Sequence, residues 1–165
     1  MKILYLVRHA KSSWAIEDIA DKDRPLKGRG IRDAHLISTY FGKTMNELMN
    51  IRLCSSSATR ALHTALIFAQ NFGIPAGQIR LVDDLYHCAW EDIHEEVKRT
   101  EDHVDILFLF AHNPSITEYV NEITNADIKN VPTTGVTGIG FDSNRWSTIP
   151  KQGKCILFEY PKRFK

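Results

Sequence analysis

The chain has 165 residues, of which 43% are hydrophobic and 25% are charged, and its formal net charge is +1. This length and balance are typical of one globular domain, which we expect to span residues 1–165. Its 21 Lys and Arg residues nearly balance its 20 Asp and Glu residues, which gives no electrostatic case for binding nucleic acid or an anionic membrane. No apolar run reaches membrane-spanning length, and the five apolar residues before Arg8 are too few for a signal-peptide core.

The three cysteines, Cys54, Cys88 and Cys155, are odd in number and have no CxxC spacing. This pattern favours a reducing compartment over a disulfide framework. Because we also find no targeting segment, we expect a cytoplasmic protein that does not associate with membranes.

A strand is predicted at residues 3–7, and it ends at the pair Arg8-His9. Its residues are apolar, branched or aromatic, which is typical of a strand buried on both faces. In open α/β sheets, ligands bind outside the carboxyl ends of the strands, so Arg8 and His9 fall where a site is expected. An isolated Arg-His pair is more often a solvated arginine and a capping histidine, so the rest of the chain decides between these interpretations.

The segment after this strand predicts a long loop and two helices. The loop runs from Lys11 to Lys27, and loops of this length inside a domain are usually functional. A helix at residues 28–41 and a strand at residues 51–54 precede a second helix that carries Arg60 in its first turn. Because helix N-termini suit anions, Arg60 is a candidate anion ligand. Trp14, within the loop, is expected to pack on the core as a lid residue.

Further strands are predicted at residues 79–82, 105–111, 135–141 and 154–160, with helices after the first two. His112 directly follows the strand at residues 105–111 and is thus a second histidine at a strand end. The alternation of strands and helices predicts an α/β sandwich with a largely parallel sheet. No helix separates the last two strands, so one of them is expected to be antiparallel.

In such a sheet, Arg8, His9, Arg60 and His112 emerge at one edge. They would form a pocket for a small multiply charged anion, and phosphate is the natural candidate because guanidinium groups match its oxygens. A neutral imidazole can attack phosphorus while arginines stabilise the charge on the equatorial oxygens. The sequence has no glycine-rich Walker loop and no histidine–carboxylate cluster with metal spacing, so we expect chemistry without a metal or a cofactor.

Four motifs in this order resemble the histidine phosphatase superfamily, and most closely its SixA-type phosphohistidine phosphatases. They are residues 6–12 with the Arg-His signature, residues 23–26 followed by Gly30, residues 56–60 with Thr64-Ala65, and residues 111–114 with the second histidine. The resemblance implies a phosphoglycerate mutase-like fold, which is a three-layer α/β/α sandwich with a six-stranded, mostly parallel sheet. It also implies that His9 becomes phosphorylated, that Arg8 and Arg60 hold the phosphoryl oxygens, and that His112 donates a hydrogen bond to the same group.

One position departs from the pattern of many members, which carry a Glu or Asp general acid two residues beyond a Leu after the third strand. Here that Leu is Leu85 and the place is taken by His87, with Glu91 and Asp92 as the nearest downstream carboxylates. An alkoxide leaving group needs a proton from a placed acid, an effect of about 10²–10⁴-fold. Phosphohistidine leaves as an imidazole, whose conjugate acid titrates near about 6.5, so it leaves readily without a strong acid.

We therefore expect a phosphatase that removes phosphate from phosphohistidine in a signalling protein. Two alternatives stay open. The first is a phosphomonoesterase for a small phosphorylated metabolite, with His87 or Glu91 as the proton donor. The second is a non-catalytic phosphate-binding module. His87 can equally be a loop residue near the rim of the pocket without a role in proton transfer.

Overall fold

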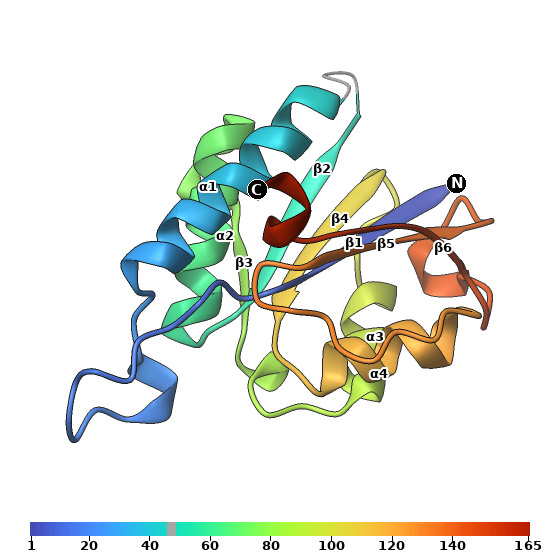
Figure 1. The fold of residues 1–165 in the computed structure, drawn as a ribbon. Helices are drawn as coiled ribbons and strands as arrows, with labels where there is room; N and C mark the ends of the chain where they lie inside the picture. Colours follow the sequence, from blue (N-terminus) through green and yellow to red (C-terminus); the bar gives the residue numbers. More distant parts are fainter. Residues whose placement is uncertain (46–48) are drawn as a thin grey trace.

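A computed structural model describes residues 1–45 and 49–165 (Figure 1). Six strands of these residues form one sheet in the order β3-β2-β4-β1-β5-β6. The strands are β1 (Lys2–Arg8), β2 (Ile51–Ser56), β3 (Arg80–Val82), β4 (Ile106–Ala111), β5 (Val136–Phe141) and β6 (Lys154–Glu159). The helices are α1 (Gly28–Thr44), α2 (Thr59–Phe72), α3 (Trp90–Lys98) and α4 (Ser115–Ile123).

Strands β1 to β4 are parallel to one another, and β5 runs antiparallel to both of its neighbours, β1 and β6. Each of the first three parallel strands is followed by a helix before the next strand begins, whereas β5 and β6 are joined without an α-helix. The expectation of a mostly parallel sheet with one antiparallel strand is therefore confirmed.

Helices cover both faces of the sheet, with α1 and α2 on one side and α3 and α4 on the other (Figure 1). Along β1, Leu4 and Leu6 pack in the cluster beneath α3 and α4, while Tyr5 and Val7 pack in the cluster beneath α1 and α2. Because successive side chains of a strand point to opposite faces, an unbroken apolar run is the pattern expected of a strand between two layers. The predicted three-layer α/β/α sandwich is confirmed.

The start of α1 packs against the loop that follows β1. A Cβ atom at Gly30 would overlap the main-chain oxygen of Lys11, so only glycine fits there. The main-chain N–H of Lys27 donates to the same oxygen at 3.0 Å. Lys27 supplies no side-chain cap to α1, so this close packing fixes the helix start and holds the chain just beyond His9.

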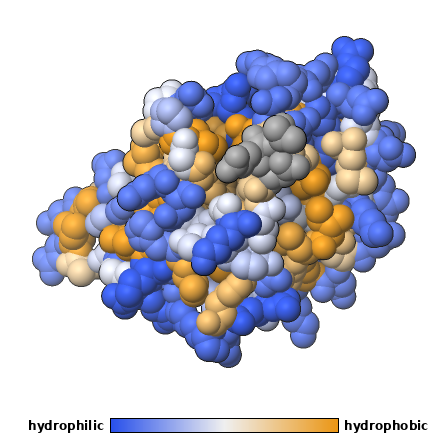
Figure 2. All heavy atoms as spheres, turned by 90° about the horizontal axis from the view of Figure 1, so that it is seen from above, coloured by the Kyte–Doolittle hydropathy of each residue, from blue (hydrophilic) through white to orange (hydrophobic). Residues whose placement is uncertain are grey.

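The face of the molecule seen from above is mostly hydrophilic, with apolar residues in separate groups (Figure 2). Within residues 1–45 and 49–165, no helix is both long enough and apolar enough to cross a membrane.

Candidate active site

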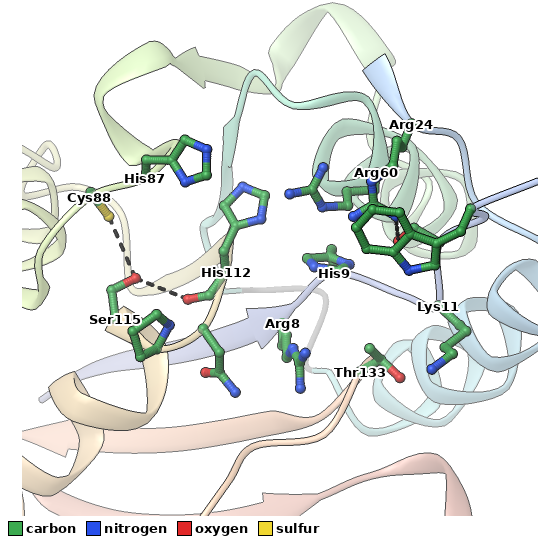
Figure 3. Close-up of a pocket in the computed structure, with 14 residues that line it drawn as sticks. Arg8, His9, Lys11, Arg24, Arg60, His87, Cys88, His112, Ser115 and Thr133 are labelled. Carbon is green, nitrogen blue, oxygen red and sulfur yellow. Dashed lines mark hydrogen bonds between the residues drawn. The ribbon is translucent and has the colours of Figure 1, made fainter. Parts of the chain in front are cut away.

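His9 and His112 leave two neighbouring parallel strands at the same level. Strands β1 and β4 are paired so that their last residues, Arg8 and Ala111, lie opposite each other. The next residue along each strand is a histidine. The main-chain N–H of His9 donates to the carbonyl of Ala111 at 3.2 Å. The two imidazole rings lie 5.2 Å apart between centroids (Figure 3). The register of the sheet thus brings together two histidines that are far apart in the sequence.

Arg60 reaches the same edge from the other neighbour of β4. Strand β2 ends at Ser56, and α2 begins shortly afterwards, which places Arg60 in the first helical turn. The Thr64 hydroxyl donates to the main-chain oxygen of Arg60 at 2.7 Å and accepts the N–H of Ala10 at 2.9 Å. Thr64 therefore joins the helical turn that carries Arg60 to the residue that follows His9.

Arg8, His9, Arg60 and His112 line one pocket with a volume of about 380 Å³ (Figure 3). His87 also lines this pocket, whereas Glu91 is exposed on α3 and is not part of its wall. The remaining lining residues are Lys11, Ser12, Trp14, Arg24, Cys88, Asn113, Pro114, Ser115 and Thr133.

The imidazole of His9 is held in one tautomer. Its Nδ1 lies 2.8 Å from the main-chain oxygen of Ala10, and a carbonyl can only accept, so Nδ1 carries the proton and Nε2 keeps a lone pair. Burial lowers the pKa of His9 to about 4, and the positive charges of Arg60, Arg8 and Arg24 act in the same direction. At neutral pH, His9 is therefore an uncharged ring whose Nε2 is available as a nucleophile.

Two of the three arginines that line the pocket, Arg8 and Arg60, keep buried donors without partners among the described residues. Arg8 donates through Nη1 to the main-chain oxygen of Val131 at 3.0 Å, and its Nε has no partner among the described residues. Arg60 donates to Asp21 through both terminal nitrogens, and its Nε is likewise unpaired within the described chain. A buried donor without an acceptor raises the free energy of the folded protein, so these two arginines would stabilise a bound anion that accepts their hydrogen bonds.

Asp21, in the loop after β1, is a position that sequence analysis did not single out. Its carboxylate accepts hydrogen bonds from Arg24 at 3.0 Å, from Arg60 at 3.1 Å and from the Tyr86 hydroxyl at 2.5 Å. These bonds, with that of Tyr86 as the largest influence, hold the pKa of the Asp21 carboxyl well below its usual range. Asp21 lies in a charged stretch of sequence, but nothing in the spacing signals that it meets Arg60.

Trp14 does not pack on the core, so that expectation is wrong. The side chain is 77% exposed and covers the guanidinium of Arg24, whose Cζ lies 3.5 Å from the ring centroid. Arg24 is buried and donates to Ser12, Ser13 and Asp21. A cation held over an aromatic face is an attractive contact, and it replaces the apolar core contacts that we had expected.

His87 lies at the rim of the pocket near His112 (Figure 3). It is an exposed residue with a φ of 54°, and its ring lies 4.0 Å from that of Tyr86 between centroids. Both interpretations of His87, as a proton donor and as a rim residue without that role, stay predictions.

The fold and the pocket together define an α/β protein with two histidines and two arginines at the carboxyl edge of a parallel sheet. The family model of the histidine phosphatase superfamily (branch 1) matches residues 4–122, which include all four of these side chains. The chain belongs to this superfamily, as its motifs predicted.

The chain is similar in sequence to a mycobacterial protein of unassigned function. The uncharacterized protein Rv1276c of Mycobacterium tuberculosis is 38% identical over 109 residues, which are 66% of this chain and 64% of Rv1276c. The chain thus spans less than two thirds of that relative.

Two solved structures share the fold. The protein histidine phosphatase SixA complexed with tungstate superposes with a TM-score of 0.81 and 17% identity, over 99% of both chains. The mycobacterial glucosyl-3-phosphoglycerate phosphatase Rv2419c complexed with VO3 gives a TM-score of 0.69 and 13% identity, over 97% of this chain and 100% of its own. At these identities the similarity establishes a shared fold, and the fold is that of the SixA-type histidine phosphatases.

Proposed function

We propose that the protein is a metal-independent phosphatase that acts through a phosphohistidine intermediate on His9, and that its substrate is phosphohistidine in a signalling protein. The observation that carries this proposal is the state of His9. The ring is buried, its lowered pKa leaves it uncharged at neutral pH, and its Nδ1 is fixed by Ala10. Its Nε2 has no hydrogen-bond partner among the described residues, in a pocket lined by three arginines.

In the proposed reaction, Nε2 of His9 attacks the phosphorus atom while the bond from phosphorus to the substrate imidazole breaks. Arg8 and Arg60 bind the phosphoryl oxygens, and His112 donates a hydrogen bond to the same group, so the charge of the transition state is stabilised. The departing imidazole takes a proton from solvent. Water then attacks the phosphorylated His9, which releases inorganic phosphate and restores the neutral ring.

The absence of a proton-donating carboxylate from the described wall of the pocket supports phosphohistidine as the substrate. None of the residues that line the pocket is Asp or Glu. The nearby Asp21 carboxyl is held ionised by its three donors and therefore has no proton to give. An imidazole leaves without such an acid, whereas an alkoxide does not. The fold shared with the protein histidine phosphatase SixA supports the same substrate class.

A small phosphorylated metabolite is the second candidate substrate. Two observations favour it: the fold is shared with a glucosyl-3-phosphoglycerate phosphatase, and His87 lies at the rim where it could protonate a leaving oxygen. Lys11 and Arg24 add positive charge to the wall, which suits a substrate with a second anionic group. A non-catalytic phosphate-binding module has less support, because such a module has no need of a neutral nucleophilic histidine.

We also propose that residues 1–165 form a single domain in the cytoplasm. The central strand β1 pairs with β5, and β5 pairs with β6, so both ends of the chain contribute to one sheet. All three cysteines of the chain lie in its described part as free thiols, which suits a reducing compartment.

A turnover panel tests the proposed function. A phosphohistidine-bearing protein, a phosphohistidine peptide and a set of alkyl phosphomonoesters are compared in the presence of a chelator. We expect the phosphohistidine substrates to be hydrolysed fastest and acid-labile phosphate to be trapped on His9 when turnover is quenched. His9→Ala should be inactive, and His103→Ala, which alters an exposed histidine outside the pocket, should match the wild type. A fully active His9→Ala variant would falsify the covalent mechanism.

A further inference from the structure

We infer that Ser56 is a positioning residue that sets the tautomer of His112, so that the ring proton of His112 resides on Nδ1. The assignment of the tautomer depends only on hydrogen bonds in the structure. The further step, that this N–H is the donor to the phosphoryl group, rests on the proposed function.

Ser56 stands at the end of β2, directly behind the second histidine. It is fully buried, and its Oγ lies 2.9 Å from Nε2 of His112. Ser56 is not part of the pocket wall, whereas His112 is. Its influence on the pocket therefore passes through the imidazole.

The direction of this hydrogen bond follows from the other neighbour of the hydroxyl. The main-chain N–H of Ala58 donates to Ser56 Oγ at 3.2 Å. A main-chain N–H can only donate, so the proton of the hydroxyl must point elsewhere. Within the described chain, Nε2 of His112 is the one remaining partner recorded for this oxygen. If Nε2 itself carried the proton, the Ser56 proton would be buried without an acceptor, which is costly.

His112 has a single proton to place, because the ring is uncharged. Burial lowers the pKa of His112 to about 3, and the neighbouring positive charges act in the same direction. With Nε2 accepting from Ser56, that proton lies on Nδ1. The Nδ1 atom is buried and has no partner among the described residues, so it is a donor ready for an anion.

The opposite tautomer would place a lone pair on Nδ1. That lone pair would repel the oxygens of a phosphoryl group rather than bind them. Loss of one donor to a developing oxyanion typically costs about 10²–10³-fold in kcat. The tautomers exchange, so kcat scales with the fraction of His112 that carries its proton on Nδ1, and a population in which the wrong tautomer predominates at about nine to one should cost on the order of 10-fold.

The test combines nitrogen-15 NMR of the histidine rings with kinetics in four proteins: the wild type, Ser56→Ala, Ser56→Thr and Ser55→Ala. Ser56→Thr keeps the hydroxyl. Ser55→Ala is the matched control, because Ser55 is equally buried on β2 and its hydroxyl donates to the main-chain oxygen of Ser56, not to His112. The signals of His112 are assigned from their loss in His112→Asn.

We expect His112 to be the Nδ1–H tautomer in the wild type, in Ser55→Ala and in Ser56→Thr. In Ser56→Ala we expect a mixture in which the Nε2–H form predominates, together with a kcat lower by about 10-fold and little change in KM. A wild-type His112 with its proton on Nε2 would overturn the inference, even if none of the variants folds. An unchanged tautomer in a folded Ser56→Ala would do the same.

The readouts separate this inference from the proposed function. If the tautomer responds to Ser56 but no phosphatase activity is found in the wild type, the positioning role stands and the proposed function fails. If the wild type is active and the tautomer does not respond to Ser56→Ala, the proposed function stands and the positioning role fails.

Discussion

Asp21 binds both terminal nitrogens of Arg60. Arg60 Nη1 donates to the main-chain oxygen of Asp21 at 2.7 Å, and Nη2 donates to its Oδ2 at 3.1 Å. The same carboxylate also accepts from Arg24 and Tyr86. The loop after β1 therefore sets the orientation of Arg60, which lies on α2. Asp21 also links Arg60 to Arg24, another arginine of the pocket wall.

Replacing Asp21 by alanine should lower kcat/KM by about 10- to 100-fold. The variant leaves Arg60 without the carboxylate that orients it, and small displacements of a positioning group have effects of this size. Steady-state kinetics and the inhibition constant of tungstate should both report the loss. Asp83→Ala is the matched control, because Asp83 is an exposed acid that pairs with Lys22 and does not contact Arg60. Equal kinetics in the two variants would contradict the positioning of Arg60 by Asp21.

The pH dependence of activity should reflect the lowered pKa of His9. Attack requires the neutral ring of His9. This ring becomes protonated only when pH falls through about 4, whereas an exposed histidine becomes protonated near pH 6.5. We therefore expect kcat/KM to show no loss from ionisation of His9 between pH 5 and 7 on the free enzyme. An NMR titration of the ring in the free protein gives the pKa directly. A value near 6.5 would contradict the proposed state of the nucleophile.

The same pKa predicts how His9 contributes to stability at different pH. The folded protein binds the His9 proton less readily than the unfolded chain does, so the contribution of His9 to the free energy of unfolding should fall as pH drops from about 6.5 to about 4 and then level off. The loss attributable to His9 is roughly 3 kcal/mol. Urea unfolding of the wild type and of His9→Gln at pH 7 and pH 4.5 isolates this contribution. A wild type whose pH dependence equals that of His9→Gln would contradict it.

The sequence was sufficient to predict the central strands and the residues that follow them. The apolar runs at the positions of β1 and β4 require burial on both faces, and the carboxyl ends of parallel strands meet at one edge. The proximity of His9 and His112 follows from those two facts. Asp21, Trp14 and Ser56 could not be assigned in this way, because their contacts depend on the path of a long loop and on the direction of a single hydroxyl proton.

Trp14 should act as a reporter of anion binding. Its indole covers Arg24, and Arg24 shares the carboxylate of Asp21 with Arg60, so an anion at Arg60 changes the charge close to the ring. Titration with tungstate should change the tryptophan fluorescence with a half-saturation equal to the inhibition constant. The signal should vanish in Trp14→Phe, which leaves Trp90 and Trp146 in place. If the full fluorescence change persisted in Trp14→Phe, it would come from Trp90 or Trp146, and Trp14 would not be the reporter.

His87 decides between the two candidate substrate classes. If it donates no proton, the rate should depend steeply on the leaving group. Phosphoramidates and aryl phosphates with acidic phenols should then be cleaved well, and alkyl phosphates poorly. His87→Ala should change the hydrolysis of phosphohistidine little, because the departing imidazole needs no strong acid. The competing interpretation, a metabolite phosphatase, requires efficient turnover of an alkyl phosphate.

A plot of log rate against leaving-group pKa separates these outcomes when it is measured for the wild type, His87→Ala and Glu91→Ala. Glu91 is exposed on α3 and outside the pocket wall, so its variant should follow the wild type and serves as the control. We expect a steep plot in all three proteins. A flat plot in the wild type that becomes steep in His87→Ala would identify His87 as a general acid, with a rate effect of about 10²–10⁴-fold for alkyl substrates. That result would contradict phosphohistidine as the substrate and favour a phosphomonoester.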